Sequence, residues 1–284
     1  MELQRYLEEF RKQGLGVFSI SYDSVAILAD FAERKNITFP LLADPQSEVI
    51  RAFGILRKNW VPKDPSWYGA ALAVTFIVDR NGIVRSKYFA EDPLERYSTP
   101  TVLLREFGSV AGTRETSVKM DQLELKYYST TDVVRASLHV TLVAGFDLKP
   151  KMHVYAPQVQ HYIPLQITLD PSPYYAALAA EYPEPEILYL APIQETVPVY
   201  RGKFRVSQDI TIAGVTALEP VLAGNQKISI RGQLRYQVCD DKICYLPQNI
   251  PVEWLLKVQP LDEQRSPEAV RHGAPPQDRK EISR

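Results

Sequence analysis

The spacing of apolar residues changes once along the chain, near residue 117, and this change constrains the fold more than any other feature. Before it, helical spacing alternates with short strand-like runs; after it, apolar and polar residues alternate, as in strands with one buried face. A chain of 284 residues is long enough for two domains. We expect an α/β domain at residues 1–110, an all-β domain at 117–260 and a disordered tail at 261–284.

Residues 1–110 combine helical stripes with short strands. Residues 3–10 place apolar side chains at i, i+3, i+4 and i+7, which predicts a first helix. Asp79-Arg80-Asn81-Gly82 supplies a turn between two strand-like runs and predicts a hairpin. The other expected elements are a strand at 17–20, helices after Ser24 and Asp44, and a last helix carrying Leu103, Leu104 and Phe107.

The second part predicts several short strands joined by Pro-rich turns, a pattern typical of a β-sandwich. Within it, residues 171–185 are rich in Pro and Tyr, and we expect a surface loop around one short helix at 175–180. The alternating segments are residues 138–143, 165–169, 204–206, 228–238 and 252–258.

Charge and composition argue against several classes of function. A net charge of -1 gives no electrostatic basis for binding nucleic acid. The longest apolar run, residues 70–78, is about half the length of a membrane-spanning helix, so we expect no membrane insertion. Two cysteines and four histidines, scattered apart from the cysteine pair, do not suggest a zinc site, and we expect no cofactor.

Cys239 and Cys244 form a Cys-x4-Cys pair where an alternating strand gives way to a turn. Closing so short a ring contributes only about 2 kcal/mol of loop entropy, so stabilising the fold is a limited benefit. A redox role is the competing interpretation. Lys242 favours the reactive thiolate whereas Asp240 and Asp241 oppose it, so the residues leave the reactivity of the pair open.

The first part of the chain resembles the peroxiredoxins of the alkyl hydroperoxide reductase and thiol-specific antioxidant (AhpC/TSA) family. The resemblance covers about residues 1–107 and implies a thioredoxin-like fold. It is carried by residues 17–24 (VFSISYDS), 39–45 (FPLLADP), 53–55 (FGI) and 74–82 (VTFIVDRNG).

Two features depart from that family. Its first strand and the loop with its reactive cysteine precede the helix that begins here at Met1, and Ala73 occupies the family's cis-proline position. We therefore expect an incomplete domain lacking its first strand. We also expect a gene that begins upstream and encodes a signal segment, that strand and the cysteine loop.

The second part resembles the N-terminal periplasmic domain of the disulfide-bond reductase DsbD. The resemblance implies an immunoglobulin-like sandwich that exchanges disulfides with another thiol or disulfide protein, either thioredoxin-like or a membrane electron donor. By this likeness either cysteine could attack. The motifs lie at residues 148–157 (LKPKMHVYAP), 200–202 (YRG), 236–239 (YQVC) and 244–247 (CYLP).

The same resemblance suggests supporting residues. Tyr245 follows Cys244 in the most specific motif, and Tyr200 ends a candidate cap loop at 197–200, where Val199 replaces the family's aromatic shield. His153 and Tyr155 share a strand face that the likeness places near the cysteines. The alternative is that His153 is a half-exposed strand residue and Tyr155 a core aromatic.

Three functions remain open from the sequence. The first is a thiol:disulfide oxidoreductase of the periplasm or another extracytoplasmic compartment. The second is an antioxidant peroxidase whose catalytic cysteine lies upstream; peroxidase activity is not expected from this chain. The third is a binding module in which the disulfide is structural.

Overall fold

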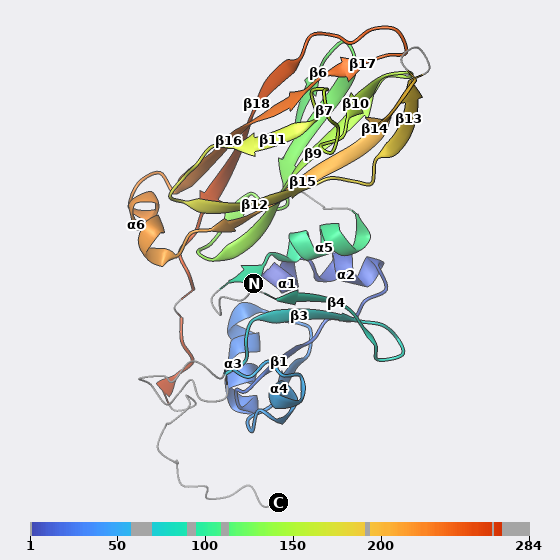
Figure 1. Ribbon diagram of the computed structural model, residues 1–284. Coiled ribbons are helices and arrows are strands. Elements are labelled where there is room, and N and C mark those ends of the chain that lie inside the picture. Colours follow the sequence, from blue (N-terminus) through green and yellow to red (C-terminus); the bar gives the residue numbers. More distant parts are fainter. Residues whose placement is uncertain are drawn as a thin grey trace, which may run out of the picture. The chain divides into compact units, whose positions relative to one another are not determined.

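The computed structural model describes residues 2–57, 70–89, 95–108, 114–190, 194–262 and 264–268. The chain divides into two compact units, Met1–Phe107 with Asp262–Arg284, and Gly108–Leu261 (Figure 1). Most of the expected tail at 261–284 lies outside the described residues.

The described part of the first unit contains five α-helices and several short strands, in the order typical of an α/β layer. Its elements are α1 (Glu2–Arg5), α2 (Leu7–Lys12), β1 (Ser19–Ser21), α3 (Val25–Lys35), β2 (Leu41–Ala43), α4 (Glu48–Ala52), β3 (Val74–Val78), β4 (Val84–Phe89), β5 (Arg96–Tyr97) and α5 (Thr99–Phe107).

The strands of this unit form two pairs. β1 and β2 are parallel, and β3 and β4 form the antiparallel hairpin predicted from the DRNG turn, in which Asp79 accepts hydrogen bonds from the N–H groups of Asn81 and Ile83 at 2.9 Å each. In the described residues the two pairs are separate two-stranded sheets.

Helix boundaries differ from the prediction in two places. The first helix is divided into α1 and α2 at Tyr6. α4 begins at Glu48 rather than directly after Asp44. Asp44 still caps this helix. Its carboxylate accepts hydrogen bonds from the backbone N–H groups of Glu48 at 2.8 Å and Ile50 at 3.0 Å, which have no intrahelical partner in the first turn.

The second unit is rich in strands and contains one helix among its described residues. Its elements are β6 (Thr116–Lys119), β7 (Leu123–Ser129), β8 (Val133–Val134), β9 (Leu138–Leu148), β10 (His153–Tyr155), β11 (Gln166–Leu169), β12 (Tyr175–Glu181), β13 (Glu186–Leu190), β14 (Glu195–Arg201), β15 (Lys203–Ile212), α6 (Val215–Ala223), β16 (Lys227–Tyr236), β17 (Val238–Cys239) and β18 (Gln248–Val258).

These strands form several sheets. One has the order β12-β15-β9-β7-β6, a second β11-β16-β18-β8, and a third β13-β14-β10-β17. Alternate side chains of β7, β9, β16 and β18 point into one large core, which includes Leu125, Leu142, Ile230 and Trp254. The alternation read from the sequence therefore marks the buried faces correctly.

The helix expected at residues 175–180 is wrong, because these residues belong to strand β12. β12 pairs with β15, with Tyr175 opposite Ile212 and a register shift between Ala177 and Ala180. The alanine-rich sequence favours a helix locally, but the strand satisfies its backbone groups by pairing with β15. Tertiary pairing here overrides helix propensity.

Candidate functional site: a disulfide at the end of β17

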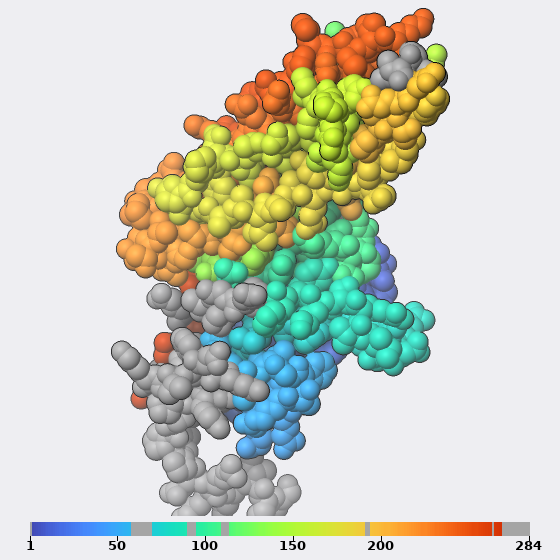
Figure 2. Space-filling view, in the orientation of Figure 1, coloured from blue at the N-terminus to red at the C-terminus, as the bar shows by residue number. Residues whose placement is uncertain are grey.

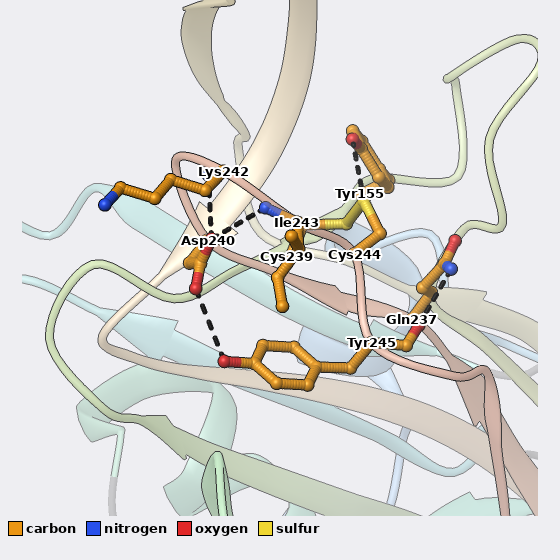
Figure 3. Close-up of a disulfide and its surroundings, with 8 residues drawn as sticks. All are labelled: Tyr155, Gln237, Cys239, Asp240, Lys242, Ile243, Cys244 and Tyr245. Atoms are coloured by element: carbon orange, nitrogen blue, oxygen red, sulfur yellow. Dashed lines mark hydrogen bonds between the residues drawn. A yellow bond between two sulfur atoms is a disulfide. The ribbon is translucent and has the colours of Figure 1, made fainter.

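β17 ends at Cys239, and the chain turns back so that Cys239 and Cys244 face each other in an antiparallel bridge. Two backbone hydrogen bonds flank the bridge, from Tyr245 N–H to the Val238 carbonyl and from Asp240 N–H to the Ile243 carbonyl, both 2.9 Å. The two Cα atoms lie 4.0 Å apart and the sulfurs are bonded at 2.05 Å (Figure 3). The backbone itself therefore places the sulfurs within bonding reach, as the sequence predicts.

The Asp240 side chain stabilises this turn by accepting hydrogen bonds from other residues of the turn. Its Oδ1 accepts the backbone N–H groups of Lys242 at 2.7 Å and Ile243 at 2.9 Å, and its Oδ2 accepts the Tyr245 hydroxyl at 3.3 Å (Figure 3). The Ile243 N–H, followed by the Lys242 N–H, holds the pKa of the Asp240 carboxyl below its usual value. The carboxylate acts as the turn's internal cap.

The two bonded cysteines differ in exposure. Cys239 is 1% exposed and packs with Tyr155, Val197 and Val199 in a small core separate from the main one. Cys244 is exposed. The turn that carries it reaches the surface at one end of the second unit, in the orange-red part of the space-filling view (Figure 2). Of the two bonded residues, Cys244 is therefore the one in contact with solvent.

Tyr155 forms an aromatic wall beside the disulfide. Its hydroxyl lies 3.9 Å from the Cys244 sulfur (Figure 3). Its ring stacks on that of Tyr162 with 4.4 Å between the centroids. Tyr162 donates to the Glu195 carboxylate at 2.6 Å, and this hydrogen bond raises the pKa of Tyr162 to about 12. Burial raises the pKa of Tyr155. Both phenols therefore stay protonated at neutral pH.

His153 lies directly opposite Cys239 in the sheet. β10 runs between β14 and β17, so Arg201, His153 and Cys239 form one row across three neighbouring strands. Residues directly opposite in antiparallel strands have Cβ atoms about 4.5–5.5 Å apart. His153 is 1% exposed, and neither ring nitrogen has a hydrogen-bond partner in the described part of the chain.

The alternative that His153 is half-exposed is therefore wrong. Burial and then Arg201 lower its pKa, whereas Asp241 and Asp240 act in the opposite direction. The imidazole is neutral at pH 7.

The structure brings together most of the residues named from the sequence, but it separates Lys242 and Tyr200 from the sulfurs. Lys242 contributes its backbone N–H to the turn, and its side chain is exposed (Figure 3). Tyr200 points into the large core, stacks on Phe204 at 4.8 Å and donates to the Pro183 carbonyl at 3.1 Å.

The expected cap loop at 197–200 is also wrong, because these residues belong to β14. Along a strand, side chains alternate between faces, so Val197 and Val199 contact the cysteine cluster while Tyr200 faces away. Val199 is fully buried against the site rather than an open substitute for an aromatic shield. Tyr162 and Glu195 were missed, since no local motif marks either residue.

Comparison with known proteins gives two separate family matches, each over less than half of the chain. Residues 125–253 match the family described as the N-terminal part of the thiol:disulfide interchange protein DsbD. Residues 1–87 match the AhpC/TSA family. The disulfide at 239–244 thus lies in the DsbD-like segment, and the AhpC/TSA segment contains no cysteine.

Similar proteins were found for the AhpC/TSA segment. A protein described as a peroxiredoxin from Mycobacterium tuberculosis (strain H37Rv) is 37% identical over 87 residues, 29% of this chain and 52% of that protein. Alkyl hydroperoxide reductase C of Staphylococcus aureus (strain N315) is 28% identical over 99 residues, 34% of this chain and 48% of that protein. The chain thus spans about half the length of these relatives.

A solved structure also aligns with part of the chain. It is the N-terminal periplasmic domain of ScsB from Proteus mirabilis, with a TM-score of 0.36 and 13% identity, covering 51% of this chain and 52% of that one.

Two searches of the described residues gave negative results. No helix among them has the length and apolar character needed to cross a bilayer. No group of three or more His, Cys, Asp or Glu residues among them is arranged to hold a metal ion.

The internal cap predicts a pH-dependent contribution of Asp240 to stability. An Asp240→Ala variant should unfold roughly 1–3 °C below the parent at pH 7 by scanning calorimetry. Because folding lowers the pKa of this carboxyl below 3.8, its contribution is complete above that pH and is lost as the pH falls through the folded-state value. The difference between the two proteins should therefore shrink as the pH is lowered below 3.8.

Asp241→Ala is the matched control, because Asp241 is exposed in the same turn and its carboxylate makes no hydrogen bond in the described residues. Equal midpoints for Asp240→Ala and Asp241→Ala at pH 7 would show that the cap does not hold the turn.

Proposed function

We propose that this protein is a thiol:disulfide oxidoreductase that works through Cys239 and Cys244. The observation that supports this most directly is the unequal exposure of two bonded cysteines, one buried and one exposed. The DsbD-like match at 125–253 points in the same direction. We also infer that the second unit is an immunoglobulin-like sandwich, an inference supported by its mainly antiparallel sheets around one large core.

The reaction begins from the reduced pair. The Cys244 thiolate attacks one sulfur of a partner disulfide; a new S–S bond joins Cys244 to the partner, and the partner's second sulfur leaves as a thiolate. Cys239 then loses its proton and attacks the Cys244 sulfur. The mixed disulfide breaks, the partner leaves with both sulfurs reduced, and the 239–244 bond forms. Two electrons pass to the partner, and the reverse sequence recharges the pair from a donor dithiol.

Cys239 needs a proton acceptor in the second step, and we propose His153 for this role. A neutral imidazole directly across the strand can accept the thiol proton, and both of its nitrogens are available in the described structure. Tyr155 and Tyr245 act as supporting residues, the first as a wall beside Cys244 and the second by anchoring the turn through Asp240.

We further propose that the partner is another thiol or disulfide protein and that the protein works in the periplasm or an equivalent extracytoplasmic compartment. A disulfide persists in such compartments, which is consistent with the bonded state of the pair. The AhpC/TSA match favours a peroxidase as the second candidate. Residues 1–87 carry no cysteine, so this segment supplies no thiol of its own for peroxide reduction.

The assignment of Cys244 as the attacking residue predicts unequal reactivity of the two thiols. In a Cys239→Ser variant the remaining Cys244 should react with iodoacetamide at least about tenfold faster than Cys239 does in a Cys244→Ser variant, because a buried thiol reacts only when the structure opens. In guanidinium the two rates should converge. Equal rates under native conditions would contradict the assignment.

The role of His153 predicts a change in the pKa of the buried thiol. In the Cys244→Ser background, His153→Phe should raise the pKa of Cys239 by roughly one unit, measured by thiolate absorbance against pH, because an apolar ring cannot stabilise the thiolate. His161→Asn serves as control, since His161 is an exposed histidine outside the row. An unchanged pKa in the Phe variant would refute the role.

A further inference from the structure

A hollow of about 400 Å³ lies beside the redox turn. It is open to solvent and is bordered by the end of β9 with the turn that follows, by the end of β14, and by one residue of the redox turn; its lining residues are Leu148, Lys149, Pro150, Lys151, Met152, Arg201, Gly202 and Asp241. A cavity of this volume is within the range of small-molecule and side-chain binding sites. The function proposed above does not use it.

Three cations line this hollow, against one carboxylate. Lys149, Lys151 and Arg201 take part in no ion pair within the described part of the chain. The Nε atom of Arg201 is buried and has no hydrogen-bond partner there. A buried guanidinium N–H without an acceptor is costly, and a carboxylate is the group whose geometry matches it best.

The hollow adjoins the turn that carries the disulfide. Asp241 lines the hollow and is only two residues from Cys239, so the Cα atoms of these two residues are at most about 7 Å apart. Arg201 belongs to the same cross-strand row as His153 and Cys239. The hollow and the turn that carries Cys244 therefore share Asp241, which brings a group bound in the hollow close to that turn.

We propose that this hollow is a carboxylate-binding subsite that orients disulfide substrates over Cys244, so that the protein prefers partners carrying an acidic group near their disulfide. The inference rests on the proposed exchange function and adds its substrate class. The carboxylate could belong to a low-mass thiol compound or to an acidic side chain of a protein, and the chemistry of recognition is the same.

The charges of the turn itself favour the opposite preference. Asp240 and Asp241 lie between the two cysteines and are offset there only by Lys242, so without the hollow an anionic disulfide should be repelled from Cys244. A preference for anionic disulfides would therefore be a specific sign of the three cations in the hollow.

The test uses the full chain, reduced, and three small disulfides of similar size. Dithiodipropionate is anionic, bis(2-hydroxyethyl) disulfide is neutral and cystamine is cationic. We expect the second-order rate constant to be highest for the anion and lowest for the cation, and the anionic advantage to shrink in 1 M salt, where charges are screened within about 3 Å.

Variants locate the effect. Arg201→Gln, and separately Lys149→Gln combined with Lys151→Asn, should lower the ratio of the anionic to the neutral rate constant about three- to fivefold. Asn suits position 151, where φ is 69°. Lys227→Gln is the control, because it removes an exposed cation on β16 outside the hollow and should leave the ratio unchanged.

A pair of cystine peptides that differ by Glu or Gln beside the disulfide identifies the source of the carboxylate. If only the Glu peptide reacts faster than its Gln counterpart, the carboxylate belongs to a protein partner. If only dithiodipropionate reacts faster than the neutral disulfide, it belongs to a low-mass thiol compound. If both react faster, either carrier is accepted. Equal rate constants for the anionic, neutral and cationic disulfides would overturn the subsite. An equal loss of the anionic-to-neutral ratio in the Lys227→Gln control would overturn it as well. Failure of the neutral disulfide to react at all would instead overturn the exchange function.

Discussion

The bond between Cys239 and Cys244 joins a buried residue to an exposed one, and the rest of the site depends on this asymmetry. The bond closes a turn whose backbone already pairs the two residues. Opening it therefore requires little rearrangement of the sheet, because the flanking hydrogen bonds from Tyr245 and Asp240 do not involve the sulfurs. A disulfide of this kind gives little entropic stabilisation and is well placed to open and close.

The surrounding sheet gives each sulfur a different environment. β10 lies between β14 and β17, so one row of opposite residues contributes Arg201 and His153 on the side of Cys239. The next position on β10 that shares this face contributes Tyr155, which is adjacent to Cys244. Cys239 is buried with a neutral imidazole opposite it in the sheet, whereas Cys244 is exposed and has the Tyr155 hydroxyl 3.9 Å from its sulfur. In the proposed exchange, Cys244 would attack the partner and Cys239 would resolve the mixed disulfide.

Much of the site could be predicted from the sequence, because local patterns encode it. The Cys-x4-Cys spacing, the strand before it and the i, i+2 placement of His153 and Tyr155 are all visible within a few residues. The hairpin of the first unit was predictable for the same reason, since Asp79 and Gly82 specify its turn.

The remaining features depend on contacts between distant segments. Alternation predicts that Val199 and Tyr200 face opposite ways once they lie in a strand, but the sequence does not reveal which of the two faces the cysteines. The stack of Tyr162 on Tyr155 and its bond to Glu195 cross from a loop to another strand. The alanine-rich residues 175–180 show the same limit, because pairing with β15 determines their conformation.

The most direct test is a redox titration of the 239–244 bond in glutathione buffers, with the oxidised and reduced fractions measured by mass spectrometry. A working exchange pair should reach half-reduction at a potential above about −300 mV, within reach of biological dithiols. A bond that stays intact well below that potential would be a permanent structural link and would contradict the account.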